Sequence, residues 1–299
     1  MLIPPALKPR DRIRVVAPSG RFDRALVLRA IAWLGRRYRV SFDWSAFSAA
    51  GMFAGSDQRR LDELNAALRD PSVRAIVVAR GGHGLARIVH GADIAAVRSQ
   101  PKWVAGFSDA TLLHVELAQA GIASLHAPNA TGLGRGHEAT RAQFIEALEH
   151  PLRERCFSHL RAWAPGFAEG PLAGGNLTLL FTWAAAGRLR LPRGCVLLLE
   201  DVTEVAYRLD RMLSALLLSG ALEEVAGIVI GEFVDCPSGP HGVTPDAVLR
   251  ERLSLLGVPV LTGLPVGHGR LNHPLPLGIS ARLDASRGTL AVGGPSAEG

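Results

Sequence analysis

The chain has 299 residues, enough for two domains of ordinary size, each with its own hydrophobic core. Hydrophobic residues make up 48% of it and charged residues 20%, which is typical of globular proteins and excludes a disordered or collagen-like chain. The formal net charge is +6, but the basic residues are scattered and often stand beside acids. Without a basic block or stripe, nucleic acid is not an expected partner.

Cysteine usage and hydropathy indicate the cellular compartment of the protein. The three cysteines, Cys156, Cys195 and Cys236, are far apart and form no CxxC pair, so neither a disulfide framework nor a cysteine zinc site is expected. No apolar run approaches the ~18 residues that a membrane helix needs. The N-terminal segment carries prolines and charges in place of the pattern of a signal peptide. We therefore expect a cytoplasmic protein without a membrane partner.

Strands and helices alternate through the first half of the chain. Short apolar runs rich in β-branched residues predict buried strands, and apolar residues at helical spacing predict the helices between them. This alternation predicts a parallel, doubly wound α/β domain over residues 1–150. The predicted strands cover 12–18, 75–80 and 102–107, and the predicted helices cover 24–38, 56–69, 85–94 and 109–121.

The second half mixes helices with more hairpin-like strands. Residues 131–170 are richer in glycine, proline and charge, so we expect a linker at 151–164 and a second domain at 165–299. That domain is expected to be a smaller α+β domain with β-barrel-like character. Its predicted helices cover 176–187, 207–222 and 244–257, and its predicted strands cover 195–200, 227–234, 258–268, 277–285 and 289–294.

A serine stands where a predicted strand passes directly into a helix, in GFSDA. Such a turn projects the Ser108 hydroxyl above the sheet and needs small residues two positions away, which Gly106 and Ala110 supply. The backbone N–H of Asp109 would face the hydroxyl as an unpaired donor at a helix start. The alternative interpretation is that Ser108 and Asp109 only cap a helix.

A second loop, RGGHG at 80–84, also joins a strand end to a helix start. Consecutive glycines let a backbone approach a bound group and direct N–H groups at negative charge. The loop could complete an oxyanion hole or hold a phosphate, although it matches neither GxGxxG nor GxxxxGK[ST]. An ordinary tight turn is the third interpretation.

Two later segments carry a carboxylate and two imidazoles. The apolar strand LLLE ends at Glu200, where a carboxylate can orient a histidine, whereas Asp201 and Glu204 are interpreted as caps of the helix that follows. The loop PVGHGRLNHPLPLG holds His268 and His273 in a rigid stretch suited to general acid–base work. No third ligand pattern accompanies the histidines, so a metal site is not expected.

Taken together, these motifs resemble the L,D-carboxypeptidases, the S66 family of serine peptidases. The family has a muramoyltetrapeptide carboxypeptidase branch and a microcin C immunity branch. The resemblance spans nearly the whole chain. The motifs that carry it are VVAPSG (15–20), RGGHG (80–84), GFSDATLL (106–113), HAPN (126–129), GGNLTLL (174–180), LLLEDVTEVAYRLDRML (197–213), GEF (231–233) and PVGHGRLNHPLPLG (265–278).

The resemblance implies a catalytic triad of Ser108, Glu200 and His268, without a metal or other cofactor. The oxyanion would then lie between the N–H groups of Gly82 and Asp109. The resemblance also implies a glutamine-amidotransferase-like (flavodoxin-like) N-terminal domain, a C-terminal domain that carries the glutamate and the histidine, and a homodimer. The remaining candidates, for binding the substrate, are Arg80, Gly81, His83 and Asn176.

The activity implied is hydrolysis of the amide between an L-centre, meso-diaminopimelate or L-lysine, and the C-terminal D-alanine of murein tetrapeptides in cell-wall recycling. One alternative is an immunity-type serine hydrolase that cleaves a peptidyl- or aminoacyl-nucleotide amide, with Trp183 or Trp163 available to stack on the base. An alternative of another class is a non-catalytic protein that binds a nucleotide or sugar phosphate at the 80–84 loop.

Three positions depart from the usual motifs of the family. His83 and Phe107 each replace a tyrosine, and Ala127 replaces a glycine. None of them is a triad position, so the departures leave the implied catalysis intact. His83 and Ala127 bear on the choice of substrate.

Overall fold

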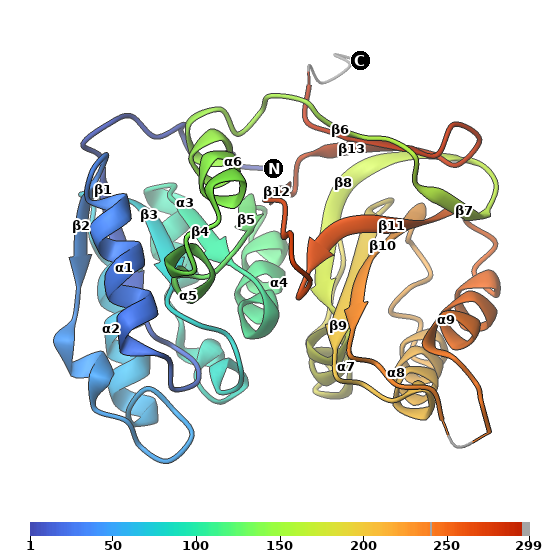
Figure 1. Cartoon of the computed structure of the whole chain (residues 1–299), viewed down its shortest axis with the longest axis horizontal. Helices are drawn as coiled ribbons and strands as arrows, with labels where there is room; N and C mark the ends of the chain where they lie inside the picture. The colour runs from blue at the N-terminus through green and yellow to red at the C-terminus, as the bar shows by residue number, and fades with distance from the viewer. Residues whose placement is uncertain (240, 295–299) are drawn as a thin grey trace. The chain divides into compact units, whose positions relative to one another are not determined.

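The computed structural model describes residues 1–239 and 241–294, which form two compact units (Figure 1). Unit 1 consists of Met1–Pro151 and the short segment His273–Leu275. Unit 2 consists of Leu152–Asn272 and, among the described residues, 276–294. Each unit has its own sheet and its own buried apolar core.

A six-stranded sheet has the order β12-β5-β4-β3-β1-β2; the strands β1 to β5 lie in unit 1, and β12 begins there at Leu275. The neighbouring strands from β2 to β5 are parallel. The apolar runs of β3 and β4 are almost wholly buried, as expected for strands that are covered on both faces, whereas the edge strand β2 is partly exposed. The bounds are Arg12–Val16 (β1), Arg39–Phe42 (β2), Val73–Val78 (β3), Trp103–Gly106 (β4), Ser124–His126 (β5) and Leu275–Leu277 (β12).

Side-chain caps define the starts of several helices of unit 1. Asp23 caps α1 and Ser56 caps α2, each by accepting hydrogen bonds from backbone N–H groups of the first turn. The parallel sheet with its alternating helices confirms the mixed α/β class predicted from the sequence. The helices are Arg24–Leu34 (α1), Asp57–Arg69 (α2), Ile94–Ser99 (α3), Thr111–Gln119 (α4), Ala130–Gly134 (α5) and Glu138–Glu149 (α6).

The single helix predicted over 85–94 is wrong. The structure has two short 3₁₀ turns, Leu85–Arg87 and Val89–Gly91, before α3 begins. Asp93 then caps α3 by accepting a hydrogen bond from the N–H of Ala96. Gly91 and the Asp93 cap therefore divide a segment whose apolar spacing alone suggested one continuous helix.

Unit 2 contains an eight-stranded sheet in the order β6-β14-β13-β8-β9-β10-β11-β7, which curls on itself (Figure 1). Strands β8, β9, β10 and β11 are parallel, and the pairings on both sides of them are antiparallel. The bounds are Arg155–Phe157 (β6), Arg161–Ala164 (β7), Phe167–Asn176 (β8), Val196–Val202 (β9), Gly227–Val234 (β10), Val260–Gly267 (β11), Ser280–Asp284 (β13) and Thr289–Val292 (β14).

Residues 151–164, which the composition suggested as a linker, hold β6 and β7 at the two ends of this sheet. Both are short edge strands in which no residue is fully buried, so they lack the apolar alternation that predicts a strand. Three helices complete the described part of unit 2. They are Leu177–Ala185 (α7), Ala206–Leu218 (α8) and Pro245–Ser254 (α9).

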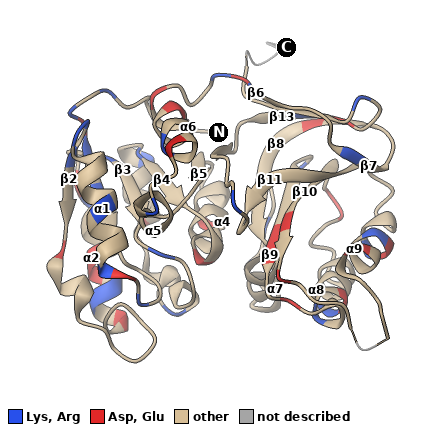
Figure 2. Cartoon of the chain, viewed as in Figure 1, with Lys and Arg blue, Asp and Glu red and all other residues tan. Residues whose placement is uncertain are grey.

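Basic and acidic positions are interspersed in both units (Figure 2). Among residues 1–239 and 241–294, no helix combines the length and the apolar character needed to cross a membrane.

Candidate active site

Ser108 occupies the strand-to-helix turn predicted from GFSDA. Strand β4 ends at Gly106, a 3₁₀ turn begins at Ser108, and α4 follows at Thr111. The φ of Ser108 is 63°, in the left-handed region that a non-glycine residue adopts only when its surroundings enforce it. A Cβ on Gly106 would lie 2.9 Å from the Cβ of Ala110, so the turn needs a residue without a side chain there.

The glycine loop lies directly against this turn. A Cβ on Gly81 would lie 2.7 Å from the Cβ of Ser108, 2.9 Å from its Oγ and 3.2 Å from the backbone N of Asp109. Gly82 has a φ of 88°, which only glycine adopts readily. The two loops that the sequence singled out in the first domain therefore meet at the Ser108 side chain.

The side chain of Asp109 ties the two loops together. Its Oδ2 accepts a hydrogen bond of 2.8 Å from the N–H of Leu85, which directly follows the glycine loop. Asp109 is fully buried, and this burial raises its pKa, while the hydrogen bond from Leu85 acts in the opposite direction. In the described structure no side chain caps this turn or α4, so the helix-cap interpretation of Ser108 and Asp109 has no support.

Asn129 fixes the end of β4 from the other side. Its Oδ1 accepts a hydrogen bond of 3.1 Å from the N–H of Phe107, and the Asn129 side chain is almost completely buried. Asn129 belongs to the HAPN motif that supports the family resemblance, but no role was predicted for it. A buried asparagine that accepts a hydrogen bond from the backbone at the end of a strand can be recognised only once the fold is known.

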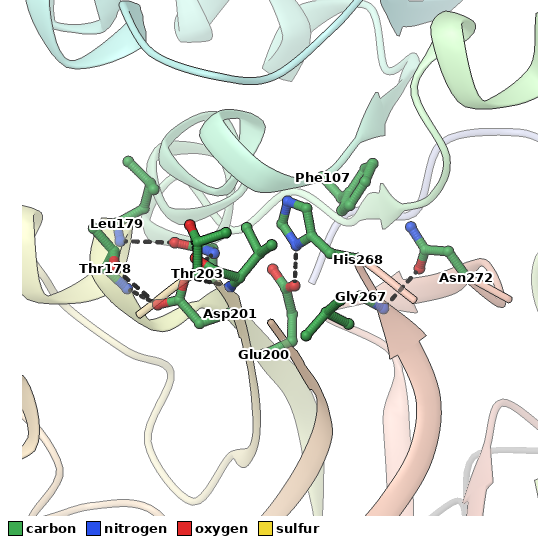
Figure 3. A network of polar contacts seen from close by, with 12 residues as sticks. Phe107, Thr178, Leu179, Glu200, Asp201, Thr203, Gly267, His268 and Asn272 are labelled. Atoms are coloured by element: carbon green, nitrogen blue, oxygen red, sulfur yellow. Dashed lines mark hydrogen bonds and ion pairs between the residues drawn. The ribbon is translucent and has the colours of Figure 1, made fainter. Parts of the chain in front are cut away.

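In unit 2, Glu200 and His268 form a close pair. The Oε2 of Glu200 lies 2.7 Å from the Nδ1 of His268 (Figure 3). Glu200 lies in β9 and His268 directly follows β11, and both strands pair in parallel with β10 between them. Their C-terminal ends share one edge of the sheet, which is the usual position of polar groups in an α/β site. The pairing predicted from the strand ends is therefore observed.

Burial and mutual contact set the protonation of this pair. Burial raises the pKa of Glu200, and the hydrogen bond and charge of His268 oppose that rise. For His268, burial lowers the pKa, but the hydrogen bond and charge of Glu200 more than offset it, so the pKa lies above its ordinary value. In the neutral ring whose Nδ1–H donates its hydrogen bond to the carboxylate, Nε2 is the basic nitrogen.

Glycines on both sides of His268 pack against carboxylates. A Cβ on Gly267 would lie 2.8 Å from the Oε2 of Glu200, and a Cβ on Gly269 would collide with the carboxylate of Glu232. The Oδ1 of Asn272 accepts a hydrogen bond of 3.1 Å from the N–H of Gly267 (Figure 3). Glu232 and Asn272 were not predicted as site residues, because their roles depend on contacts with this loop.

Asn176 and Asp201 belong to a neighbouring network in unit 2. The Nδ2 of Asn176 donates a hydrogen bond of 2.9 Å to the Oδ1 of Asp201, and its Oδ1 caps α7 by accepting from Leu179. The Oδ2 of Asp201 accepts from the backbone N and the hydroxyl of Thr178, at 2.9 and 2.8 Å (Figure 3). These contacts hold the Asn176 amide in place beside β9.

The prediction that Asp201 and Glu204 cap the following helix is wrong. That helix is α8, and it has no side-chain cap in the described structure. Asp201 instead supports the start of α7, and Glu204 forms an ion pair of 3.7 Å with Arg208. The sequence placed both acids just before α8, whereas the fold brings α7 closer to Asp201.

The other predicted binding residues lie in different surroundings. The Nη1 of Arg80 donates a hydrogen bond of 2.5 Å to the backbone oxygen of Arg21. His83 is exposed, with its ring centroid 5.9 Å from that of Phe53. Trp183 is 3% exposed in α7 and packs in the core, so it offers no shelf for a nucleotide base. In the part of the chain that the structure describes, no three His, Cys, Asp or Glu residues are grouped to hold a metal ion.

Comparison with known proteins decides the family. The profile of the LD-carboxypeptidase N-terminal domain matches residues 13–127, and that of the LD-carboxypeptidase C-terminal domain matches residues 169–283. The chain belongs to the LD-carboxypeptidase family. The resemblance carried by the sequence motifs is thus confirmed, and the chain is an enzyme of the carboxypeptidase class.

Relatives of this LD-carboxypeptidase include two named for murein peptides. The murein tetrapeptide carboxypeptidase of Pseudomonas aeruginosa is 33% identical over 249 residues, which cover 78% of this chain and 80% of the relative. The crystal structure of muramoyltetrapeptide carboxypeptidase from Oxalobacter formigenes is 31% identical, with a TM-score of 0.84 over 95% of this chain and 100% of that one.

The microcin C7 self immunity protein MccF has the same fold. Its structure in complex with glutamyl sulfamoyl guanosine has a TM-score of 0.87 over 99% of each chain, at 21% identity. At that identity the likeness concerns the fold alone.

Proposed function

We propose that this protein is a serine L,D-carboxypeptidase that removes the terminal D-alanine from murein tetrapeptides. The observation that carries the proposal is the buried Glu200 bonded to His268, an arrangement that makes a histidine a strong base. The strained Ser108, set against the glycine loop, supports a nucleophile. The names of the two relatives above support the substrate class.

The chemistry is acyl transfer in two steps. Ser108 Oγ attacks the carbonyl carbon of the L-centre, either meso-diaminopimelate or L-lysine, while His268 Nε2 takes the hydroxyl proton. The amide C–N bond then breaks as His268 returns that proton to the amine of the leaving D-alanine. Water hydrolyses the acyl-enzyme by the same route, with His268 again acting as the base. Glu200 stabilises the imidazolium in both steps.

The tetrahedral intermediate places negative charge on the former carbonyl oxygen. The N–H groups of Gly82 and Asp109 are the proposed donors to this oxygen, each lowering the barrier by about 3 kcal/mol. The close approach of Gly81 to Ser108 supports this assignment, because it brings the backbone of the loop beside the reacting atoms. A cytoplasmic homodimer, as the resemblance implies, is part of the same proposal.

Incubation of the purified protein with L-Ala-γ-D-Glu-meso-diaminopimelyl-D-Ala, followed by mass spectrometry, tests the proposal. We expect the wild type to release one D-alanine and Ser108→Ala to release none, while the exposed control Ser99→Ala keeps full activity. Equal release by Ser108→Ala would exclude the serine mechanism.

If the wild type released no D-alanine from the tetrapeptide, the proposed substrate would be wrong. Aminoacyl sulfamoyl adenosine is then the next substrate, and its cleavage would place the protein with the immunity-type hydrolases. Binding of nucleotides without any cleavage would instead support the non-catalytic alternative.

A further inference from the structure

Unit 1 has a cavity of about 300 Å³ that the chemistry above does not use. Three arginines line it, Arg21, Arg80 and Arg135, together with Thr131 and the single acid Asp23. All the residues that line the cavity belong to unit 1.

Backbone contacts fix the three segments that line the cavity. The N–H of Gly20 donates to the carbonyl oxygen of Gly81 at 3.2 Å, which joins the loop after β1 to the loop after β3. The N–H of Thr131 in α5 donates to the carbonyl oxygen of Ala79 at 3.0 Å. Together with the bond from Arg80 to the Arg21 carbonyl, these contacts hold the arginine-bearing loops in one arrangement.

The cavity lies where ligands usually bind in a sheet of this kind. Strand β1 has β2 on one side and β3 on the other, so the connections after β1 and β3 diverge at the C-terminal edge. Such a switch point is the common ligand position in open parallel sheets. Arg21 follows β1 and Arg80 follows β3, which places two of the three cations at this point.

The charge of the cavity is unbalanced. Asp23 Oδ1 already accepts the N–H groups of Ala25 and Leu26, at 2.8 and 3.2 Å, as the cap of α1. Within residues 1–239 and 241–294, none of the three arginines forms an ion pair with a carboxylate. Guanidinium groups are the preferred partners of carboxylates, which they bind through paired N–H donors.

One loop that lines the cavity also packs against the proposed nucleophile. Arg80 directly precedes Gly81, whose backbone lies against Ser108. We propose that Arg21, Arg80 and Arg135 form a subsite for a carboxylate of the peptide substrate, and this inference rests on the proposed function. The tetrapeptide carries three carboxylates, on D-glutamate, on the distal end of diaminopimelate and on the terminal D-alanine.

Four peptides identify the carboxylate that binds. They are the tetrapeptide and three analogues in which one carboxylate at a time is replaced by its amide. We expect Arg135→Gln and Arg21→Gln to lower kcat/KM for the tetrapeptide about ten- to hundredfold. On the analogue that lacks the bound carboxylate, the same variants should cause no further loss, because the interaction is already absent. Arg135→Lys, which keeps the charge, should recover part of the rate.

Arg36→Gln is the matched control, since Arg36 is an exposed arginine of unit 1 that does not line the cavity. It should leave kcat/KM unchanged on all four peptides. An equal loss on all four peptides for the cavity variants, or no loss on any, would overturn the subsite.

Failure of the proposed function would be seen separately, as no cleavage of any peptide by the wild type. Calorimetric binding of the tetrapeptide to Ser108→Ala protein then decides the question of the subsite. Weaker binding after Arg135→Gln is added would support the subsite, and unchanged or undetectable binding would overturn it.

Discussion

Ser108 and Gly81 show how closely two backbone segments must approach for this site to form. The φ of Ser108 lies in the left-handed region, and the space in front of its side chain is left by the missing Cβ of Gly81. The glycine is thus needed for space, because the structure gives a positive φ to Gly82 and not to Gly81.

Gly81→Ala should therefore reduce kcat sharply, by about a hundredfold, because the new methyl group would displace Ser108 or the proposed oxyanion donors. Overpacking of this kind should also lower the free energy of unfolding by about 1–3 kcal/mol. Kinetics on the tetrapeptide and urea unfolding measure the two effects. Gly239→Ala, at a glycine whose Cβ would meet nothing within 4 Å, is the control. Wild-type kcat in Gly81→Ala would contradict the assignment of this loop.

The Glu200–His268 pair gives a prediction for pH dependence. His268 must be neutral to accept the Ser108 proton, so kcat/KM should fall as the pH drops through the pKa of His268. Because Glu200 raises that pKa, the acid limb should lie above the ordinary value for histidine. Glu200→Gln removes the charge and leaves burial to dominate, so the limb should move to lower pH while the maximal rate falls about a hundredfold or more. A limb that stays in place would show that the two groups are not coupled.

At the scale of residues, much of the candidate active site was predictable from the sequence. Ser108 follows the end of β4, Glu200 lies close to the end of β9, and His268 stands in a loop whose glycines and prolines can be noticed without a fold. The side chains of Asp109, Asn129 and Glu232 were not, because each acts on backbone from a segment far away in the sequence. Roles of that kind depend on which loops meet, and no local pattern encodes this.

At the scale of elements, the turn after β4 and the loop after β3 behave as one assembly. Asp109 supplies the connection, since it accepts the Leu85 N–H in a fully buried position. Removing a buried acceptor leaves the N–H without a partner, which costs about 1–3 kcal/mol.

Asp109→Ala should accordingly lower both stability and kcat, while KM changes less, because the loop carries a proposed oxyanion donor. Asp109→Asn keeps an oxygen that can accept the Leu85 N–H, so it should recover much of both quantities. Urea unfolding and tetrapeptide kinetics test this pair of variants. If Asp109→Ala lost stability but kept its kcat, the side chain would be structural only.

Most of the long strands and helices were recognised from periodicity, but the ten-residue strand β8, with three glycines and a proline, was missed together with several short elements. Strands β6, β7 and β12 have three or four residues each, too few for an alternation to be recognised. The segment 85–94 had the apolar spacing of a helix, but Gly91 and the Asp93 cap end one element and begin another. The flavodoxin-like description of the N-terminal domain stays a prediction.

At the scale of the whole molecule, unit 1 depends on a strand from late in the chain. β12 occupies one end of its sheet, next to β5, and Leu275 in this strand is completely buried. Leu275→Ala should lower the free energy of unfolding by about 2–5 kcal/mol through the cavity it leaves. Leu218→Ala, at a leucine that is 89% exposed, should change it little. If urea unfolding showed that Leu275→Ala lowers the free energy of unfolding as little as Leu218→Ala does, β12 would contribute nothing to the stability of the sheet.

The late position of β12 has a consequence for the synthesis of the protein. A ribosome completes β1 to β5 early, but the edge strand that joins β5 emerges only after residue 277 has left the tunnel. Until then β5 has an unpaired edge, the feature through which nascent sheets pair with other chains. His268 lies only a few residues before that strand, so the growing chain receives the proposed general base and the last strand of its first sheet almost together. An unfinished chain would thus lack activity, and the sheet would gain its protecting edge as synthesis nears completion.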